Sequence, residues 1–190
     1  TILTILNTDI FYNYEYAFYD SHLMSEFKNF TSHYFRFTTK PFDFLNINGG
    51  IGTGNEIAYL EEIPELGDRF SFNTSLEITL NNNLRIKPSI DLSRLKKIDS
   101  QDYFFDGYIA RFDVRYQFTS FIDLRVISEY NEFTDQFFIQ PLLSWRPNAD
   151  TIFYFGGNQN YIDNFIDYNS PHYRVNKSQF FFKFQYLIKS

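Results

Sequence analysis

The stretch Arg69–Arg94, RFSFNTSLEITLNNNLRIKPSIDLSR, decides how this chain is expected to fold. From Phe70 to Leu80 every second residue is apolar or threonine, and the same alternation resumes at Leu84 and continues to Leu92. Polar and charged residues occupy the positions between them. Because successive side chains of a β-strand point to opposite faces, this period of two predicts two strands, each with one apolar face.

The asparagines between these strands are expected to form a tight turn. A turn over Asn81–Asn83 pairs Leu80 with Leu84. The same register places Glu77 opposite Lys87, and opposite charges that face each other across two strands stabilise the pairing. The charges of this hairpin therefore gather on one face.

The next hairpin, YIARFDVRYQFTSFIDLRVISEY at residues 108–130, has the same pattern. A register in which Gln117 faces Phe121 predicts two ion pairs on its polar face, Arg115–Asp123 and Asp113–Arg125. Such ladders of charge suit the inside of a narrow β-barrel, where long polar side chains fill the lumen and pair with one another. A solvated face of an ordinary sheet explains the alternation as well, and this alternative stays open.

The composition limits the class of protein. The chain has 190 residues, of which 22% are aromatic, and its mean hydropathy is −0.34. No apolar run approaches the roughly 20 residues of a membrane helix, but strands that alternate escape such a test. The chain has no cysteine, which excludes disulfides and thiolate chemistry, and its net charge of −6 argues against a nucleic-acid partner.

The alternation recurs along the whole chain and predicts about ten strands and no convincing helix. We expect them at residues 9–20, 28–38, 42–53, 69–80, 84–95, 107–117, 121–131, 136–146, 151–160 and 179–188. Most are longer than the usual five or six residues of soluble proteins, and they match the roughly 9–11 residues of a tilted strand that crosses a bilayer.

The connections are predicted to alternate between short and long. The short ones are Thr38–Pro41, Asn81–Asn83, Phe118–Ser120 and Pro147–Asp150, and the long ones are 21–27, 54–68, 96–106 and 161–178, with a smaller one near 131–135. Outer-membrane barrels have tight periplasmic turns on one rim and long extracellular loops on the other. We therefore predict a single all-β domain over residues 1–190: an antiparallel transmembrane outer-membrane β-barrel, or the C-terminal segment, about ten strands, of a larger one.

In this interpretation the apolar face meets lipid and the charged face is the inside. Aromatic residues near strand ends are expected to form the interfacial girdles, and the candidates are Tyr108, Tyr116, Phe118, Tyr130, Trp145 and Tyr186. Pro88 and Pro141 fall inside predicted strands, where each removes a ladder hydrogen bond, so bulges or local irregularity are expected there. The facing of residues 28–38 and 151–160 is not assigned by their pattern.

Three segments carry a resemblance to a known family. They are YFRFTTKPFDFLNINGGIGTG (34–54), LSWRPNADTIFYFGGNQNY (143–161) and FFFKFQYLIKS (180–190), with Trp145–Pro147 and Lys183–Tyr186 the most specific parts. They resemble the C-terminal region of a Bacteroidota outer-membrane family of unassigned function that carries an N-terminal carbohydrate-binding family-9-like domain. The resemblance implies that this chain is the final part of a barrel whose earlier strands and sugar-binding-like domain lie upstream. The hydrolase label that this family sometimes carries has no support among these residues.

The search for catalytic chemistry gives no site. Motifs of metalloproteases, serine hydrolases and P-loop enzymes are missing from the sequence, and NGGIGTG at Asn48–Gly54 is interpreted as a strand in which glycines allow close approach. A metal or acid–base site at His22 and His172, in long loops, is a remote alternative, and His33 lies apart from them. Acidic residues in the predicted loops could bind calcium, although a solvated loop rim explains them equally well: Glu56, Glu61, Glu62, Glu65, Asp99, Asp102, Asp106, Asp163 and Asp167. Aromatic residues in the same loops could bind sugars or a protein, although packing of the loops on one another explains them too: Tyr59, Tyr103, Phe104, Phe105, Tyr161, Phe165, Tyr168 and Tyr173.

The predicted function is that of an outer-membrane β-barrel in a Gram-negative bacterium, serving as anchor, pore or scaffold component of a cell-surface complex and not an enzyme by itself. Its partners are the lipid bilayer, other outer-membrane proteins or upstream barrel strands, and glycans; nucleic acid is not expected. No catalytic, cofactor-binding or metal-binding residue is assigned. Two alternatives stay open: a membrane-embedded hydrolase or glycan-related surface protein with its site in the extracellular loops, and a soluble all-β binding domain whose apolar face is its core.

Overall fold

A computed structural model describes residues 2–5, 8–17, 30–59, 61, 63–163 and 173–187 of the chain. Its elements are all strands: β1 (Ile2–Ile5), β2 (Thr8–Ala17), β3 (Phe30–Phe42), β4 (Leu45–Ala58), β5 (Glu65–Thr79), β6 (Leu84–Lys97), β7 (Tyr103–Thr119), β8 (Ile122–Asn131), β9 (Gln136–Asn148), β10 (Thr151–Asp163) and β11 (Tyr173–Tyr186). No helix in these ranges has the length and apolar character needed to span a membrane.

The strands form one antiparallel sheet in which each strand is hydrogen-bonded to the next along the chain, in the order β1 to β11. This confirms the predicted all-β antiparallel fold. Among the described strands the order is that of an open sheet, since it starts at β1 and ends at β11 without a pairing between the two. The closed transmembrane barrel therefore stays a prediction.

The strands are longer than the alternation predicted. Much of the predicted loops 54–68 and 96–106 is strand, because β4 and β5 leave a connection of residues 59–64 and β6 and β7 leave one of residues 98–102. The predicted turn at Thr38–Pro41 lies inside β3, and the chain turns at residues 43–44 instead. The ladder of β3 and β4 shifts register between Thr39 and Phe42, so the proline marks an irregularity and not the turn. Strand β1 was not predicted, because four residues are too few to show a period.

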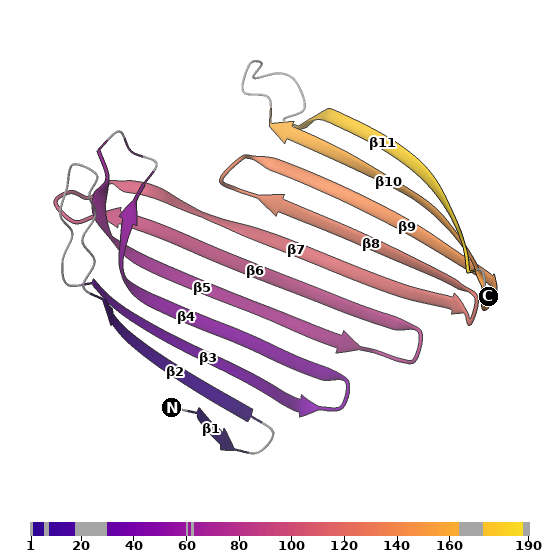
Figure 1. Cartoon of the computed structure of the whole chain (residues 1–190), viewed down its shortest axis with the longest axis horizontal. Coiled ribbons are helices and arrows are strands. Elements are labelled where there is room, and N and C mark those ends of the chain that lie inside the picture. Colours follow the sequence, from indigo (N-terminus) through magenta and orange to yellow (C-terminus); the bar gives the residue numbers. More distant parts are fainter. Residues whose placement is uncertain are drawn as a thin grey trace. The chain divides into compact units, whose positions relative to one another are not determined.

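Contacts divide the chain into two compact units, which are described separately. Unit 1 is Thr1–Leu76 with Ser89–Tyr108, and unit 2 is Glu77–Pro88 with Ile109–Ser190. In unit 1, strands β2, β3 and β4 lie side by side (Figure 1). Its most buried side chain is that of Leu95, which is 1% exposed and packs closely against Gly67.

The glycines of β4 allow the close approach that was predicted for them. A methyl group on Gly50 would lie 2.5 Å from the hydroxyl oxygen of Tyr34, and one on Gly49 would lie 2.4 Å from the Phe37 ring. The Tyr34 hydroxyl also accepts a hydrogen bond from Asn73 Nδ2 (3.3 Å). These glycines therefore let aromatic rings of β3 cover the strand, and they form no phosphate cradle.

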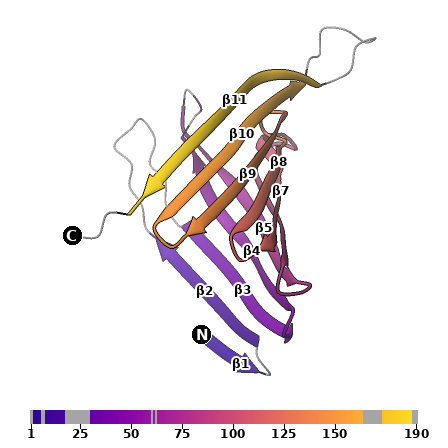
Figure 2. The same ribbon diagram turned by 90° about the vertical axis from the view of Figure 1, so that its right-hand side faces the viewer.

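In unit 2, strands β8 to β11 form consecutive hairpins, and β9, β10 and β11 lie side by side in both views (Figures 1 and 2). Pro141 lies inside β9, opposite Val126 of β8. The register of β9 with β10 is the same on both sides of it, from Leu142↔Gly156 to Ile139↔Gln159. No residue is gained at Pro141, but the ladder pairs of Gln140 and Pro141 with β10 are missing, so the predicted irregularity is present as an interruption of the ladder without a bulge. Pro88 lies within β6.

Candidate functional site

The predicted asparagine turn between β5 and β6 is confirmed. The Leu80 N–H donates to the carbonyl oxygen of Leu84 (3.1 Å), and Asn81 Oδ1 accepts from the N–H groups of Asn83 (2.9 Å) and Leu84 (2.8 Å). The carboxylate of Glu77 then lies 2.9 Å from Lys87 Nζ and 3.4 Å from Arg85 Nε. The predicted pairing of Glu77 with Lys87 is present, and Arg85 joins it.

The predicted ion pairs of the next hairpin are present in a different register. Arg115 faces Arg125 and Asp113 faces Ile127, whereas Gln117 was expected to face Phe121. The turn is formed by residues 120–121 and not by Phe118–Ser120, because Thr119 Oγ1 accepts hydrogen bonds from the N–H groups of Phe121 and Ile122. This shifts the pairing by two residues, and the ion pairs run diagonally between the strands.

Asp113 and Arg125 form the tightest of these pairs. The Arg125 Nε donates to both carboxylate oxygens of Asp113 at 3.2 Å, and Nη2 donates to Oδ2 as well. Bidentate pairs of this kind fix both orientation and distance. The pair therefore holds β7 and β8 in their shifted register.

Asp123 is the most buried charged group of this face. Its side chain is 7% exposed and accepts a hydrogen bond from Arg146 Nη1 (2.9 Å), while Arg115 Nε lies 3.9 Å away. Further along the strands, Arg111 Nη1 lies 3.5 Å from Glu129 Oε2. We call the side of unit 2 that carries these groups the charged face, and it consists of Glu77, Arg85, Lys87, Arg111, Asp113, Arg115, Asp123, Arg125, Glu129 and Arg146.

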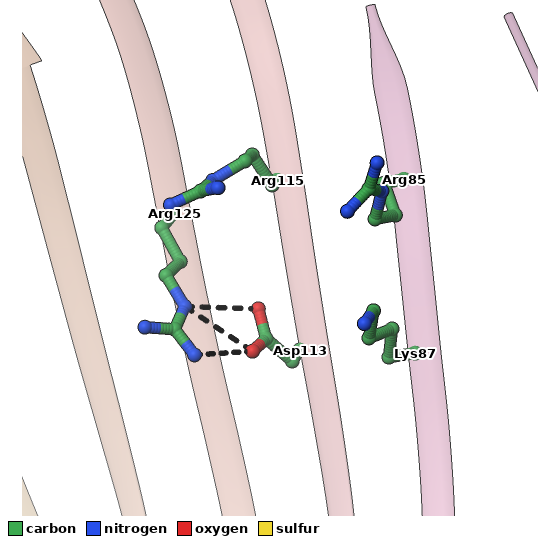
Figure 3. A pocket seen from close by; sticks show the side chains of 5 residues that line it. All are labelled: Arg85, Lys87, Asp113, Arg115 and Arg125. Carbon is green, nitrogen blue, oxygen red and sulfur yellow. Dashed lines mark hydrogen bonds and ion pairs between the residues drawn. The ribbon is translucent and has the colours of Figure 1, made fainter. Parts of the chain in front are cut away.

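The charged face contains a hollow of about 200 Å³ between β6, β7 and β8 (Figure 3). It is lined by Arg85, Lys87, Asp113, Arg115 and Arg125. Four of these five side chains are cationic. Figure 3 shows Arg85 and Lys87 on one strand, facing Arg115 and Asp113 on the next.

The opposite side of β7–β11 carries no Asp, Glu, Lys, Arg or His over five consecutive rows of paired residues. We call it the aromatic face. Its members are Ala110, Phe112, Val114, Tyr116, Ile122, Leu124, Val126, Ser128, Tyr130, Phe137, Ile139, Pro141, Leu143, Trp145, Phe153, Phe155, Gly157, Gln159, Tyr161, Ser178, Phe180, Phe182 and Phe184. This register also assigns Phe153 and Phe155 to the aromatic face, which the sequence pattern left open.

Aromatic rings gather at both ends of the aromatic face. At one end Trp145, Phe153 and Phe184 are paired across three strands, with ring centroids 5.1 and 5.2 Å apart. At the other end Tyr130, Phe137 and Tyr161 are paired, and with Tyr173 they line an apolar hollow. Smaller and aliphatic side chains occupy much of the space between the two rows.

Exposure follows the position of the strand in the sheet as well as the face. Phe180 and Phe182 of β11 are 85% and 58% exposed. Strand β11 pairs only with β10 in the described sheet, and its residues are exposed on both faces. Asp123 and Ser144, on strands with two neighbours, are 5% and 3% exposed, and Asp123 is contacted by Arg115 and Arg146.

Several residues singled out from the sequence lie elsewhere than expected. Glu56, Glu65, Asp106, Asp163, Tyr103, Phe104, Phe105, Tyr161 and Tyr173 lie in strands and not in loops, because the strands extend beyond their predicted ends. Tyr59, Glu61, Asp99 and Asp102 lie in connections, as predicted. His22, His172, Glu62, Phe165, Asp167 and Tyr168 lie outside the described residues.

The remaining histidine and the acids show no metal site. His33 lies in β3, where its Nδ1 is 2.9 Å from the Tyr12 hydroxyl. Within the ranges that the structure describes, no three His, Cys, Asp or Glu side chains are grouped closely enough to hold a metal ion. The charged face is the feature that sequence reasoning described least well, since the hollow depends on the diagonal register of β7 and β8.

Comparison of the chain with protein-family models, with curated proteins and with solved structures gave no match.

Proposed function

We propose that this chain forms part of the wall of an outer-membrane β-barrel, with the aromatic face against lipid and the charged face toward the interior. The observation that carries the proposal is the separation of charge between the two faces of β7–β11 over five consecutive rows of paired residues. Backbone groups inside hydrocarbon must be hydrogen-bonded within the protein, and a continuous antiparallel sheet provides this for every strand that has two neighbours.

The dimensions of the aromatic face support this proposal. Phe137 and Trp145, which lie in the two aromatic rows, are eight residues apart on β9. At about 3.4 Å per residue this is roughly 27 Å along the strand, and a tilt of about 40° reduces it to roughly 21 Å across a bilayer. Outer-membrane barrels have an apolar band about 25 Å tall with an aromatic girdle at each edge.

Strand β6 has an uncharged stretch of the same length. Its uncharged alternate residues run from Leu84 to Leu92, again eight residues. The next residue of the same parity is Arg94, whose Nε lies 3.4 Å from Asp106 Oδ1. A charged pair is costly within hydrocarbon and tolerated at the interface, so this pair fits the end of such a stretch.

The biological role that fits this arrangement is that of an anchor, pore or scaffold component of a cell-surface complex in the outer membrane of a Gram-negative bacterium. The resemblance to the Bacteroidota family favours this role, and it adds upstream barrel strands and glycans to the lipid bilayer as proposed partners. The charged side chains of unit 2 are directed at one another across neighbouring strands, which is the arrangement expected inside a barrel.

The single tryptophan of the sequence provides the test. Trp145 lies at the end of the aromatic face and is 43% exposed, so in vesicles its indole ring should lie at the bilayer interface. We expect its fluorescence to be quenched strongly by lipids brominated close to the headgroup and weakly by lipids brominated near the chain ends. Fluorescence of the full chain folded into phosphatidylcholine vesicles measures this directly.

Two outcomes of this experiment would contradict the proposal. Quenching by neither lipid would place Trp145 in water, away from the bilayer. If the deep bromines quench most strongly, Trp145 lies at the centre of the membrane. That position would disagree with its place at the edge of the eight-residue apolar band. A Trp145→Phe variant, which keeps an aromatic ring, provides the background signal.

A further inference from the structure

The hollow on the charged face contains an unusual concentration of like charges. Arg115 of β7 and Arg125 of β8 are directly opposite each other in the ladder. Like charges in this position destabilise a pair of strands. Arg125 is neutralised by its bidentate bond to Asp113, whereas the nearest carboxylate oxygen to Arg115 is 3.9 Å away.

The carboxylates that surround the hollow do not balance its cations. Glu77 is shared by Arg85 and Lys87, and Asp123 is shared by Arg115 and Arg146. With the Asp113–Arg125 pair, five basic side chains stand against three carboxylates, an excess of two positive charges. The whole chain has a net charge of −6, so this excess is local.

The geometry of the cations suits an oxyanion. Arg85 and Lys87 of β6 and Arg115 of β7 line the same hollow, and Figure 3 shows the Arg115 side chain extended toward Arg125 of β8. A volume of about 200 Å³ accommodates one tetrahedral oxyanion with several waters, since a water molecule occupies about 30 Å³ in the liquid. Guanidinium and ammonium groups form charge-assisted hydrogen bonds to phosphate and sulfate oxygens.

We infer that this hollow is an anion-binding site for a phosphate or sulfate group, either as the free ion or as part of a small solute. Arg115 is the principal contact, because its own carboxylate partner is distant, and Arg85 and Lys87 complete the site. The bound dianion neutralises the two excess charges and removes the repulsion between Arg115 and Arg125. The site depends on the charged face alone and is independent of what covers the aromatic face.

The test is a calorimetric titration of the purified full chain with sodium phosphate, in detergent at low ionic strength and neutral pH. The wild-type chain should bind phosphate saturably, and saturating phosphate should raise its melting temperature. Arg115→Gln should weaken binding by at least about tenfold and abolish the thermal shift. Because this substitution removes a like-charge contact, the variant should melt no lower than wild type without phosphate, so a loss of binding will not reflect unfolding.

Arg111→Gln is the matched control. Arg111 lies on the same strand and face as Arg115, but it pairs with Glu129 and does not line the hollow. It should change phosphate affinity by less than about twofold, an amount expected from general electrostatics. Equal losses in the two variants would overturn the site, as would a wild-type chain that takes up no phosphate or shows the same thermal shift with acetate at matched ionic strength.

The membrane proposal and the anion site fail in different ways. A chain that dissolves without detergent would contradict the lipid-facing role of the aromatic face, and the phosphate titration could then be made in plain buffer. Absence of phosphate binding would leave the Trp145 quenching experiment unaffected, because Trp145 lies on the aromatic face.

Discussion

Adjacent residues of one type occupy opposite environments in this chain. Leu142 and Leu143 follow each other in β9, yet Leu142 faces Arg125 across the ladder and Leu143 faces Leu124. Neither position is fully buried. The structural difference between them is therefore the face of the sheet on which each side chain lies.

Arginine at each of these two positions should separate the two media. Leu143→Arg places a charge inside the proposed apolar band and should lower the free energy of unfolding by about 2 kcal/mol. Leu142→Arg places the same charge on the charged face, opposite Arg125, where the cost is that of one like-charge contact and should be less than about 1 kcal/mol. Urea unfolding of the chain in vesicles measures both values. Equal costs would show that the two faces meet the same medium.

Strands β7 and β8 show how side chains fix the pairing of elements. The Asp113–Arg125 pair and the Thr119 turn act together to set a register two residues away from the one that the turn residues predicted. A change of two residues keeps every side chain on its original face. This is why the predicted ion pairs were confirmed although the predicted register was wrong.

Of the carboxylates on the charged face, Asp123 should contribute most to the stability of the contacts between β7, β8 and β9. Asp123→Asn leaves Arg115 and Arg146 without their shared charge in a position that is 7% exposed, and it should cost about 2 kcal/mol. Glu129→Gln, which breaks the more exposed pair with Arg111, should cost less than about 1 kcal/mol. Thermal melting in detergent compares the two, and a larger effect at Glu129 would contradict this order.

At the scale of the whole molecule, the exposed aromatic rings of β11 form an apolar surface that is unfavourable in water. Phe180, Phe182, Phe184 and Tyr186 are each more than half exposed and lie on one face. A soluble protein rarely leaves so large an aromatic patch in water. In the proposed membrane location, the acyl chains of the lipids would contact these rings, and no further protein would be needed to cover them.

The expressed chain should therefore be recovered in the membrane fraction, and its purification should require detergent. We expect it to stay in the membrane pellet after an alkaline wash, which strips proteins held by charge alone. Sedimentation and size-exclusion chromatography check this. A monodisperse monomer in detergent-free buffer would contradict the proposed function and favour the soluble alternative, in which the apolar face is the core of an all-β binding domain.

The sequence by itself determined the fold class and the facing of most strands. A period of two is visible in residues such as Phe72, Leu76 and Ile78, because backbone geometry alone alternates the side chains of a strand. The same pattern was enough to predict the charged pairing of Glu77 with Lys87.

Tertiary structure decided the strand ends, the register of β7 with β8 and the hollow between Arg85 and Arg115. These features depend on contacts between residues far apart in the chain, and a local period does not encode them. The facing of Phe153 also had to come from its neighbours, since apolar residues on both sides of β10 hide the alternation until Trp145 and Phe184 are paired with it.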